Sequence, residues 1–507
     1  MRTSIYFPRI KKYIDANIGD NLLDVIRADE IPIEATCGGK GTCGKCKVMV
    51  NGEEKLACTT EVSEGMNVEI LTDFEDIRII TDSKISQTFI SSNNDLEKPT
   101  SIGVAIDIGT TTVVIKVLDA TNGKELAVRA FLNPQRPYGA DVLSRINISM
   151  DDASTLSSII KKRLDKEIAD VFKTEKLDPG NVTVFVLAGN TTMCYLLMNK
   201  PCRALGLAPF IPDYKFETYY KYDEIFDSST LECECHIYPY VSAFVGGDIV
   251  AGLVNIEQHR LKEDAGDNSK TSYMLVDMGT NGEIAYRYGE RLIATSTAAG
   301  PALEGGNISC GMGGTDGAIY STKYIDGKFE IMTIGDVPPI GICGSGVISI
   351  VSELIKAGFI EESGSFSETV TDKVVMVEAS EESPEIAFTQ RDVREFQLAK
   401  GAIRTGIDIL IEETGQFPEV LYLAGGFGQH IDLESAFCVG LLPSEMRGRT
   451  EISGNTSLGG CVDACLDSDL INKTDEVCAG AEEINLAAHP KFNDAFIDNM
   501  SFEYATS

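Results

Sequence analysis

The sequence predicts a mixed α/β and α+β chain, in which a small β-rich module precedes a larger α/β region built from two similar halves. Three observations predict this organisation. Near the N-terminus three cysteines stand within ten positions, and a fourth follows. A strand–turn–strand motif with an aspartate at its turn occurs twice. Towards the C-terminus an apolar strand runs into paired glycines.

Length and composition indicate several folded domains and exclude some partners. At roughly 100–200 residues per domain, 507 residues make three or four units. No run of about 18 apolar residues is present, and the N-terminus lacks an apolar stretch with a cleavage site, so we expect a cytoplasmic protein with no membrane partner. The net charge of −33 argues against nucleic acid, because phosphate binding needs a basic surface.

The cysteine cluster predicts a metal centre. Its ligands would be spaced Cys37-x5-Cys43-x2-Cys46-x11-Cys58. Structural zinc sites usually carry two short C-x2-C pairs, whereas here three cysteines share one loop and the fourth stands alone. That asymmetry matches the plant-type [2Fe–2S] pattern, lengthened by one residue. We therefore expect a [2Fe–2S] cluster, with zinc or plain core cysteines as the alternatives.

Glycines and a hairpin complete this module. Glycines within and beside the cysteine loop let the backbone curl and point N–H groups at sulfur: Gly38, Gly39, Gly41 and Gly44. An Asn51-Gly52 turn predicts a hairpin that returns Cys58 to the loop. With a helix at 22–29 and a closing strand at 68–73, residues 1–74 resemble a β-grasp ferredoxin. Residues 75–100, rich in Ser, Asn and Asp, are the predicted linker.

The repeated motif predicts two phosphate-binding loops. Residues 101–119 (SIGVAIDIGTTTVVIKVLD) and 272–290 (SYMLVDMGTNGEIAYRYGE) both indicate a strand, a D-x-G-T turn and a second strand. Glycine lets the backbone come close to a phosphate, and turn N–H groups and threonine hydroxyls donate to its oxygens. An aspartate at the strand end can hold Mg²⁺ directly or through water. Two such loops could grip the phosphates from opposite sides.

A third element is VLYLAGGFGQHID, residues 420–432, where a strand enters Gly425-Gly426 and a helix is predicted from Asp432. Paired glycines at a helix entry let a nucleotide lie on bare backbone. The alternative is a strand–helix connection that needs glycine only for packing. Apolar patterns also predict a strand at 123–133, a strand ending in a polar loop at 182–193, and helices at 244–254, 343–358 and 391–415.

In this order the three motifs resemble the acetate kinase, sugar kinase, Hsp70 and actin superfamily over about 101–480. The resemblance implies a two-lobed, duplicated RNase H-like ATPase, with a first lobe at 101–265 and a second lobe with a C-terminal tail at 266–507. It puts at the phosphates and Mg²⁺ Asp107, Gly109, Thr110, Thr111, Thr112, Asp277, Gly279, Thr280 and Asn281. It puts Gly425 and Gly426 at the adenosine. Beside the second loop, Glu283 could orient the attacking water.

A [2Fe–2S] module joined to an ATPase suggests an electron that must move uphill. Raising one electron by about 0.3 V costs roughly 7 kcal/mol, which ATP hydrolysis can supply. The cysteine spacing together with DIGTTT, LAGNTTM, DMGTNGE, AAGPALEGGNISCGM, GICGSG, RDVREFQLAKGAI and LAGGFG resembles the reductive activators of corrinoid proteins. That resemblance implies ATP-dependent reduction of cob(II)alamin to cob(I)alamin on a separate corrinoid protein of a methyltransferase system. It also implies a low-potential electron donor, and it leaves a homodimer open.

Other functions remain as alternatives. One is an ATP-dependent activator of another low-potential enzyme. Another is a ferredoxin-type electron carrier with a regulatory nucleotide-binding module, and a third is a small-molecule kinase. Residues 298–314 (AAGPALEGGNISCGMGG) are expected near the junction of the lobes or the partner surface, or else in a buried turn.

Overall fold

The computed structural model describes residues 1–29, 31, 33, 35, 38–41, 44–71, 99–139, 141–263, 272–279, 281–380, 383–425 and 430–502. Four predicted site residues lie outside the described residues: Cys37, Cys43, Thr280 and Gly426. Most of the predicted linker also lies outside them. Among the described residues, no helix combines the length and the apolar character needed to cross a membrane.

The N-terminal module has the predicted β-grasp elements. Strands β1 (Arg2–Phe7) and β2 (Lys12–Asn17) pair antiparallel, and α1 (Leu22–Ala28) follows. Strand β3 (Lys47–Val50) lies between β4 (Glu53–Leu56) and β5 (Val68–Ile70) in a second sheet. Asn51 and Gly52 have left-handed backbones, with φ of 51° and 88°, as an Asn-Gly hairpin turn requires. Apolar residues from α1 and the strands share one core.

The first lobe is built on a six-stranded sheet of order β10-β11-β9-β6-β7-β8. Strand β6 (Ile102–Ile108) pairs antiparallel with β7 (Thr112–Asp119), which pairs with β8 (Glu125–Leu132). On its other side β6 runs parallel to β9 (Val182–Gly189). The remaining elements of this lobe are α2 (Val142–Glu175), α3 (Thr191–Leu197), α4 (Arg203–Gly206), β10 (Tyr220–Lys221), α5 (Tyr222–Phe226), β11 (Glu234–Ile237) and α6 (Gly247–Glu263).

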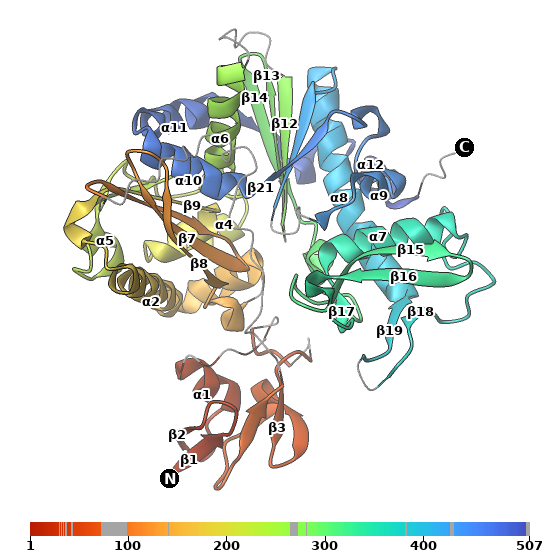
Figure 1. Cartoon of the computed structure of the whole chain (residues 1–507), viewed down its shortest axis with the longest axis horizontal. Coiled ribbons are helices and arrows are strands. Elements are labelled where there is room, and N and C mark those ends of the chain that lie inside the picture. The colour runs from red at the N-terminus through yellow and green to blue at the C-terminus, as the bar shows by residue number, and fades with distance from the viewer. Residues whose placement is uncertain are drawn as a thin grey trace.

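The second lobe repeats this arrangement with the order β21-β20-β12-β13-β14-β22. Strands β12 (Ser272–Met278), β13 (Gly282–Tyr288) and β14 (Arg291–Thr297) form the antiparallel part. Strands β20 (Val420–Ala424) and β21 (Thr450–Gly454) add the parallel part beside β12. The D-x-G-T turn therefore joins the first two strands of the meander in both sheets, which confirms the duplicated, two-lobed architecture. Figure 1 shows the first sheet at the left and the second at the top.

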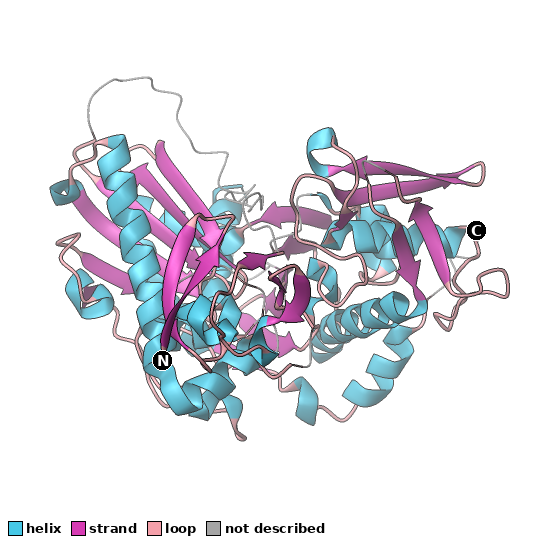
Figure 2. Cartoon of the chain, turned by 90° about the horizontal axis from the view of Figure 1, so that it is seen from below, coloured by secondary structure: helices cyan, strands magenta, loops and turns pink. Residues whose placement is uncertain are grey.

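A smaller sheet and several helices complete the second lobe. The sheet comprises β15 (Ala318–Ile325), β16 (Lys328–Thr333) and β17 (Gly341–Ile342), with α7 (Gly344–Lys356) packed on β15. A hairpin of β18 (Lys373–Val377) and β19 (Ile386–Thr389) leads into α8 (Gln390–Thr414). Figure 2 shows these elements grouped on the opposite side of the molecule from the first lobe.

The helix α10 (Thr456–Leu466) joins the lobes, although it comes from the C-terminal part of the chain. It packs against α6 and against β6 and β9 of the first sheet. Cys461 and Cys465 share one face of this helix, as their spacing predicts. Their thiols face the carbonyl oxygens of Ile106 and Val104 at 3.4 and 3.6 Å. These two cysteines are therefore buried packing residues.

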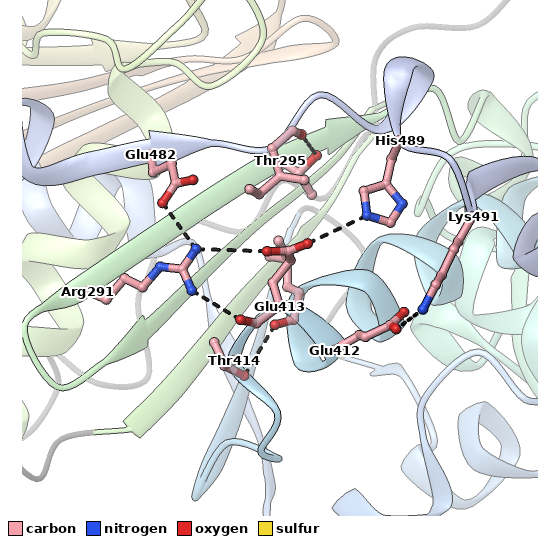
Figure 3. A network of polar contacts seen from close by, with 10 residues as sticks. Arg291, Thr295, Glu412, Glu413, Thr414, Glu482, His489 and Lys491 are labelled. Carbon is pink, nitrogen blue, oxygen red and sulfur yellow. Dashed lines mark hydrogen bonds and ion pairs between the residues drawn. The ribbon is translucent and has the colours of Figure 1, made fainter.

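The C-terminal segment is fastened to the second lobe through polar contacts (Figure 3). Arg291 pairs with Glu482 of β22 (Ala481–Glu483) at 3.1 Å and with Glu413 of α8 at 3.9 Å. His489 lies 3.6 Å from the same Glu413 carboxylate, and Lys491 pairs with Glu412. The remaining helices are α9 (Leu433–Cys438), α11 (Asp469–Gly480) and α12 (Phe492–Met500).

Candidate functional site

The cysteine loop has the backbone that its glycines predict. Gly38, Gly39, Gly41 and Gly44 all adopt positive φ, between 67° and 99°, a conformation that other residues rarely adopt. At these four positions the backbone turns as only glycine does readily, and the N–H of Gly38 donates to the carbonyl of Ala35 at 2.8 Å.

The hairpin brings two of the four cysteines together. Cys46 directly precedes β3, and Cys58 lies in the short 3₁₀ turn after β4 (Ala57–Thr59). The N–H of Ala57 donates to the carbonyl of Cys46 at 2.8 Å, so Cys58 returns beside Cys46 as predicted. The two residues are 1% and 8% exposed. Buried thiol donors on a curled glycine loop fit an iron–sulfur cluster.

The first aspartate loop lies at the end of β6 and is held from two directions. Asp107 accepts hydrogen bonds from Asn455 Nδ2 and Ser457 Oγ, both at 2.8 Å, at the start of α10. A Cβ on Gly109 would lie 2.8 Å from the carbonyl oxygen of Thr112, so only glycine fits this turn. Thr110 Oγ1 accepts a hydrogen bond from Asn190 Nδ2 at 2.9 Å.

The second aspartate loop packs against the paired-glycine segment. Asp277 is in register with Glu283 of β13 and with Ala424 of β20. Gly425 has φ of 113°, and a Cβ there would lie 3.1 Å from Asp277 Oδ1. The strand into Gly425 therefore ends beside the second aspartate.

Glu304 connects the two loops. It ends the 3₁₀ turn Pro301–Glu304 of the second lobe, and its Oε2 accepts a hydrogen bond from Thr111 Oγ1 at 3.2 Å. A Cβ on Gly279 would lie 3.7 Å from Glu304 Oε1. The segment 298–314 thus reaches the junction of the lobes through Glu304, while Ala302 and Leu303 before it are buried.

Four carboxyl groups at this junction have raised pKa values. Burial, followed by the charges of Asp248 and Asp107, raises the pKa of Asp277 to about 8. Burial and then Asp107 raise the pKa of Asp248 to about 7. Burial also raises the pKa of Asp107, against its bonds to Asn455 and Ser457, and raises that of Glu283 well above its ordinary value. Burial is the main cause at each carboxyl, and neighbouring carboxylates add to it at Asp248, Asp277 and Glu283, so a bound cation would favour the ionised forms.

Sequence reasoning missed several residues of this site. Asp248 lies in the first turn of α6 and Glu304 in a glycine-rich segment, and both segments were singled out without a role for these carboxylates. Asn190, Asn455 and Ser457 hold the first loop from α3 and α10. Asn190 and Asn455 are N-cap residues of their helices, a signal that predicts a helix start but not a contact with a distant loop.

The chain matches three protein families along most of its length. The 2Fe-2S iron-sulfur cluster binding domain matches residues 8–69. The RACo middle region matches residues 102–261, and the C-terminal domain of RACo, the ASKHA domain, matches residues 271–506.

Individual relatives cover nearly the whole chain. The sequence is 29% identical to the corrinoid activation enzyme RamQ of Eubacterium limosum, over 98% of this chain and 99% of that protein. It is 26% identical to the [Co(II) methylated amine-specific corrinoid protein] reductase of Methanosarcina barkeri, over 79% of this chain and 77% of that protein. The solved structure of a reductive activator for corrinoid, iron-sulfur protein superposes with a TM-score of 0.70 at 25% identity, over 99% of this chain and 98% of that one.

Proposed function

The chain belongs to the RACo family of reductive activators of corrinoid proteins, and on that premise we propose that it uses ATP to return a corrinoid protein from cob(II)alamin to cob(I)alamin. The proposal rests on one observation, which is that two kinds of site occur in the same chain. A cysteine loop of the 2Fe-2S type precedes two aspartate loops that face each other across the lobes. When bound, the [2Fe–2S] cluster supplies single electrons, and each converts one Co(II) to Co(I).

The partners follow from this reaction. The corrinoid protein of a methyltransferase system is the substrate and is a separate chain. A low-potential donor must replace each electron that leaves. Because fourteen cysteines and an iron–sulfur cluster need a reducing compartment, we propose a cytoplasmic location.

We propose that Mg²⁺-ATP binds where the two aspartate loops meet. Asp107 and Asp277 offer oxygen ligands of the kind that Mg²⁺ prefers, directly or through water. The backbone and hydroxyls of Gly109, Thr110, Thr111 and Thr112 and of Gly279, Thr280 and Asn281 would hold the phosphates. Gly425 and Gly426 would leave room for the adenosine.

Two carboxylates compete for the role of orienting the attacking water. Glu283 is only 8% exposed, and its raised pKa favours the neutral acid, which is a poor proton acceptor. Its link to Asn281 suits it to shaping the second loop. Glu304 reaches both loops and lies where a phosphate would draw Thr111 away from it. We therefore propose Glu304 as the main water-orienting residue and Glu283 as its support.

ATP hydrolysis in the presence of the partner tests the function. The holoprotein should hydrolyse ATP faster when Co(II) corrinoid protein is added, and Co(I) corrinoid protein should not have this effect. Electron paramagnetic resonance of the reduced protein should give a [2Fe–2S] signal. If the rate of ATP hydrolysis is the same with Co(II) and Co(I) corrinoid protein while the [2Fe–2S] signal is intact, the protein is instead an electron carrier with a regulatory nucleotide site.

A further inference from the structure

The N-terminal module contacts the first lobe at a small surface, which we call the ferredoxin seat: Pro137, Tyr138 and Ile148. Arg27 of α1 donates a hydrogen bond to the carbonyl of Pro137. Its guanidinium also lies over the Tyr138 ring, 4.8 Å from the centroid. Both contacts hold a side chain that is only 9% exposed. In Figure 1 the module lies below the first lobe.

The seat also covers one side of the cysteine loop. A Cβ placed on Gly38 would lie 3.1 Å from the carbonyl oxygen of Tyr138 and 3.2 Å from Cδ1 of Ile148. Gly38 directly follows the predicted ligand Cys37. A corrinoid could not approach the loop from this side while the module is seated.

Behind the seat, Arg145 of α2 connects it to the first aspartate loop. This arginine is completely buried. Its Nε donates to the carbonyl of Gly139 at 2.9 Å, and its Nη2 donates to the carbonyl of Thr110 at 2.5 Å. One planar guanidinium therefore connects Gly139, the residue after Tyr138, to Thr110 of the first aspartate loop.

A second connection runs in parallel. Asn133 donates from its backbone N–H to the carbonyl of Thr111 at 2.9 Å and from Nδ2 to the carbonyl of Gly109 at 2.8 Å. The N–H of Arg136, which begins the turn of the seat (Arg136–Tyr138), bonds in turn to the carbonyl of Asn133 at 3.0 Å. Three consecutive carbonyls of the loop, 109 to 111, are thus held by Asn133 and Arg145, which flank the turn of the seat.

Burying a guanidinium is costly unless its donors are matched, and Arg145 offers a rigid fork that fits several carbonyls at once. Two of its partners are backbone oxygens, those of Gly139 and Thr110, and its Nη1 also donates to Gln135 Oε1 at 3.3 Å and to Met193 Sδ at 3.1 Å. An apolar residue could fill the same space but could not hold the two backbone segments in register.

We propose that Arg145 is a positioning residue that couples nucleotide binding at the first aspartate loop to the ferredoxin seat. When the first aspartate loop holds no nucleotide, the seat holds the N-terminal module, and one side of the cysteine loop is covered. Phosphate binding at Thr110 and Thr111 moves their carbonyls, shifts the Pro137–Gly139 turn and releases the module towards the corrinoid protein. By linkage, seating of the module and nucleotide binding oppose each other. The inference rests on the proposed function, which supplies both the nucleotide at the first aspartate loop and the purpose of the release.

Hydrogen–deuterium exchange on the full-length holoprotein tests the coupling, with and without Mg²⁺ and a non-hydrolysable ATP analogue. In the wild type the analogue should increase exchange in peptides spanning α1 and residues 135–139. Arg27→Ala loses a charge-assisted hydrogen bond and a cation–π contact, which shifts the seated-to-released ratio by roughly tenfold or more. Its exchange should be high without nucleotide and unchanged by the analogue, while its visible spectrum and basal ATP hydrolysis stay as in the wild type.

Lys55→Ala is the matched control, because it removes an exposed cation of the same module, paired with Glu53 at 3.2 Å, away from the seat. It should behave as the wild type. Arg145→Lys keeps the charge but cannot bridge both carbonyls. It should bind the analogue and keep its cluster spectrum, yet show no response of exchange to the analogue.

Exchange that is identical with and without the analogue in the wild type would overturn the coupling, and so would Arg27→Ala exchange that matches Lys55→Ala. Cobalt reduction, measured on the same samples, separates this inference from the proposed function. Nucleotide-dependent exchange without any Co(I) formation contradicts the proposed corrinoid reduction and supports the coupling of nucleotide binding to the ferredoxin seat. Co(I) formation without nucleotide-dependent exchange contradicts only the coupling of nucleotide binding to the ferredoxin seat.

Discussion

Thr111 Oγ1 donates a hydrogen bond to Glu304 Oε2 at 3.2 Å, so the first aspartate loop is linked to a carboxylate of the opposite lobe. A phosphate at this loop would compete for the Thr111 hydroxyl. Glu304 would then be released beside the phosphate, where a carboxylate can orient water.

Replacing Glu304 by glutamine tests this role. Glu304→Gln keeps the size of the side chain but removes the proton acceptor, so ATP turnover should fall by roughly 10²–10⁴-fold while nucleotide still binds. Steady-state hydrolysis and nucleotide titration measure the two effects separately. Glu290→Gln, at an exposed turn after β13, is the control and should leave turnover unchanged. Full turnover in Glu304→Gln would assign the water to another residue, with Glu283→Gln as the next variant.

The two loop aspartates should be needed for hydrolysis but not for the cluster. Asp107→Asn and Asp277→Asn each remove a ligand charge for Mg²⁺, whose charge stabilisation is worth several kcal/mol, so ATP-dependent reduction should fall at least about a hundredfold. The visible spectrum of the cluster should remain. Asp498→Asn, on the exposed side of α12, should match the wild type. If the spectrum disappears along with the activity, these aspartates serve folding instead.

Cysteine replacements should separate the ligands from the packing cysteines. Cys58→Ser should remove the visible spectrum and the iron, because one of the four predicted ligands is lost. Cys478→Ser alters a partly buried cysteine of α11 and should keep both. Iron and acid-labile sulfide analysis of the two variants gives the answer. An unchanged iron content in Cys58→Ser would remove Cys58 from the ligand set.

The stability of the nucleotide-free protein should depend on pH. Folding raises the pKa of Asp277 to about 8 and that of Asp248 to about 7, so between roughly pH 4 and 8 the folded state binds more protons than the unfolded chain. The free energy of unfolding should therefore fall as pH rises through this window. Mg²⁺ binds the ionised carboxylates, so Mg²⁺-ADP should stabilise the protein more at pH 8 than at pH 6.

Thermal unfolding at the two pH values, with and without Mg²⁺-ADP, measures both effects. Asp248→Asn should weaken the pH dependence of the nucleotide-free protein, because it removes one titrating group and also a charge that raises the pKa of Asp277. A nucleotide-free protein that melts at a higher temperature at pH 8 than at pH 6 would contradict the assignment of these pKa values.

Local patterns predicted most of the fold. Alternating and continuous apolar runs indicated β6, β7, β12 and β13, and helical spacing indicated α8 from residue 391, one residue after its observed start. Asn51-Gly52 predicted the hairpin turn. These elements depend on neighbours in the sequence, which is the range that periodicity and turn chemistry describe.

Long-range contacts were harder to predict. Asp107 is bonded to residues almost 350 positions away, at the start of α10, and no local pattern reveals such a pair. Arg145 lies in a long helix rich in charged residues, where an exposed arginine is the usual expectation, yet tertiary packing buries it. Glu304 stands among glycines that gave no periodic signal.

Formation of Co(I), followed by absorbance, tests whether the protein couples ATP to reduction of a corrinoid protein. Purified Co(II) corrinoid protein is mixed with the holoprotein and a low-potential donor, with and without Mg²⁺-ATP. We expect Co(I) to accumulate only when both the ATP and the cluster-loaded protein are present. Equal rates of Co(I) formation without ATP, or with protein whose cluster has been removed, would contradict it.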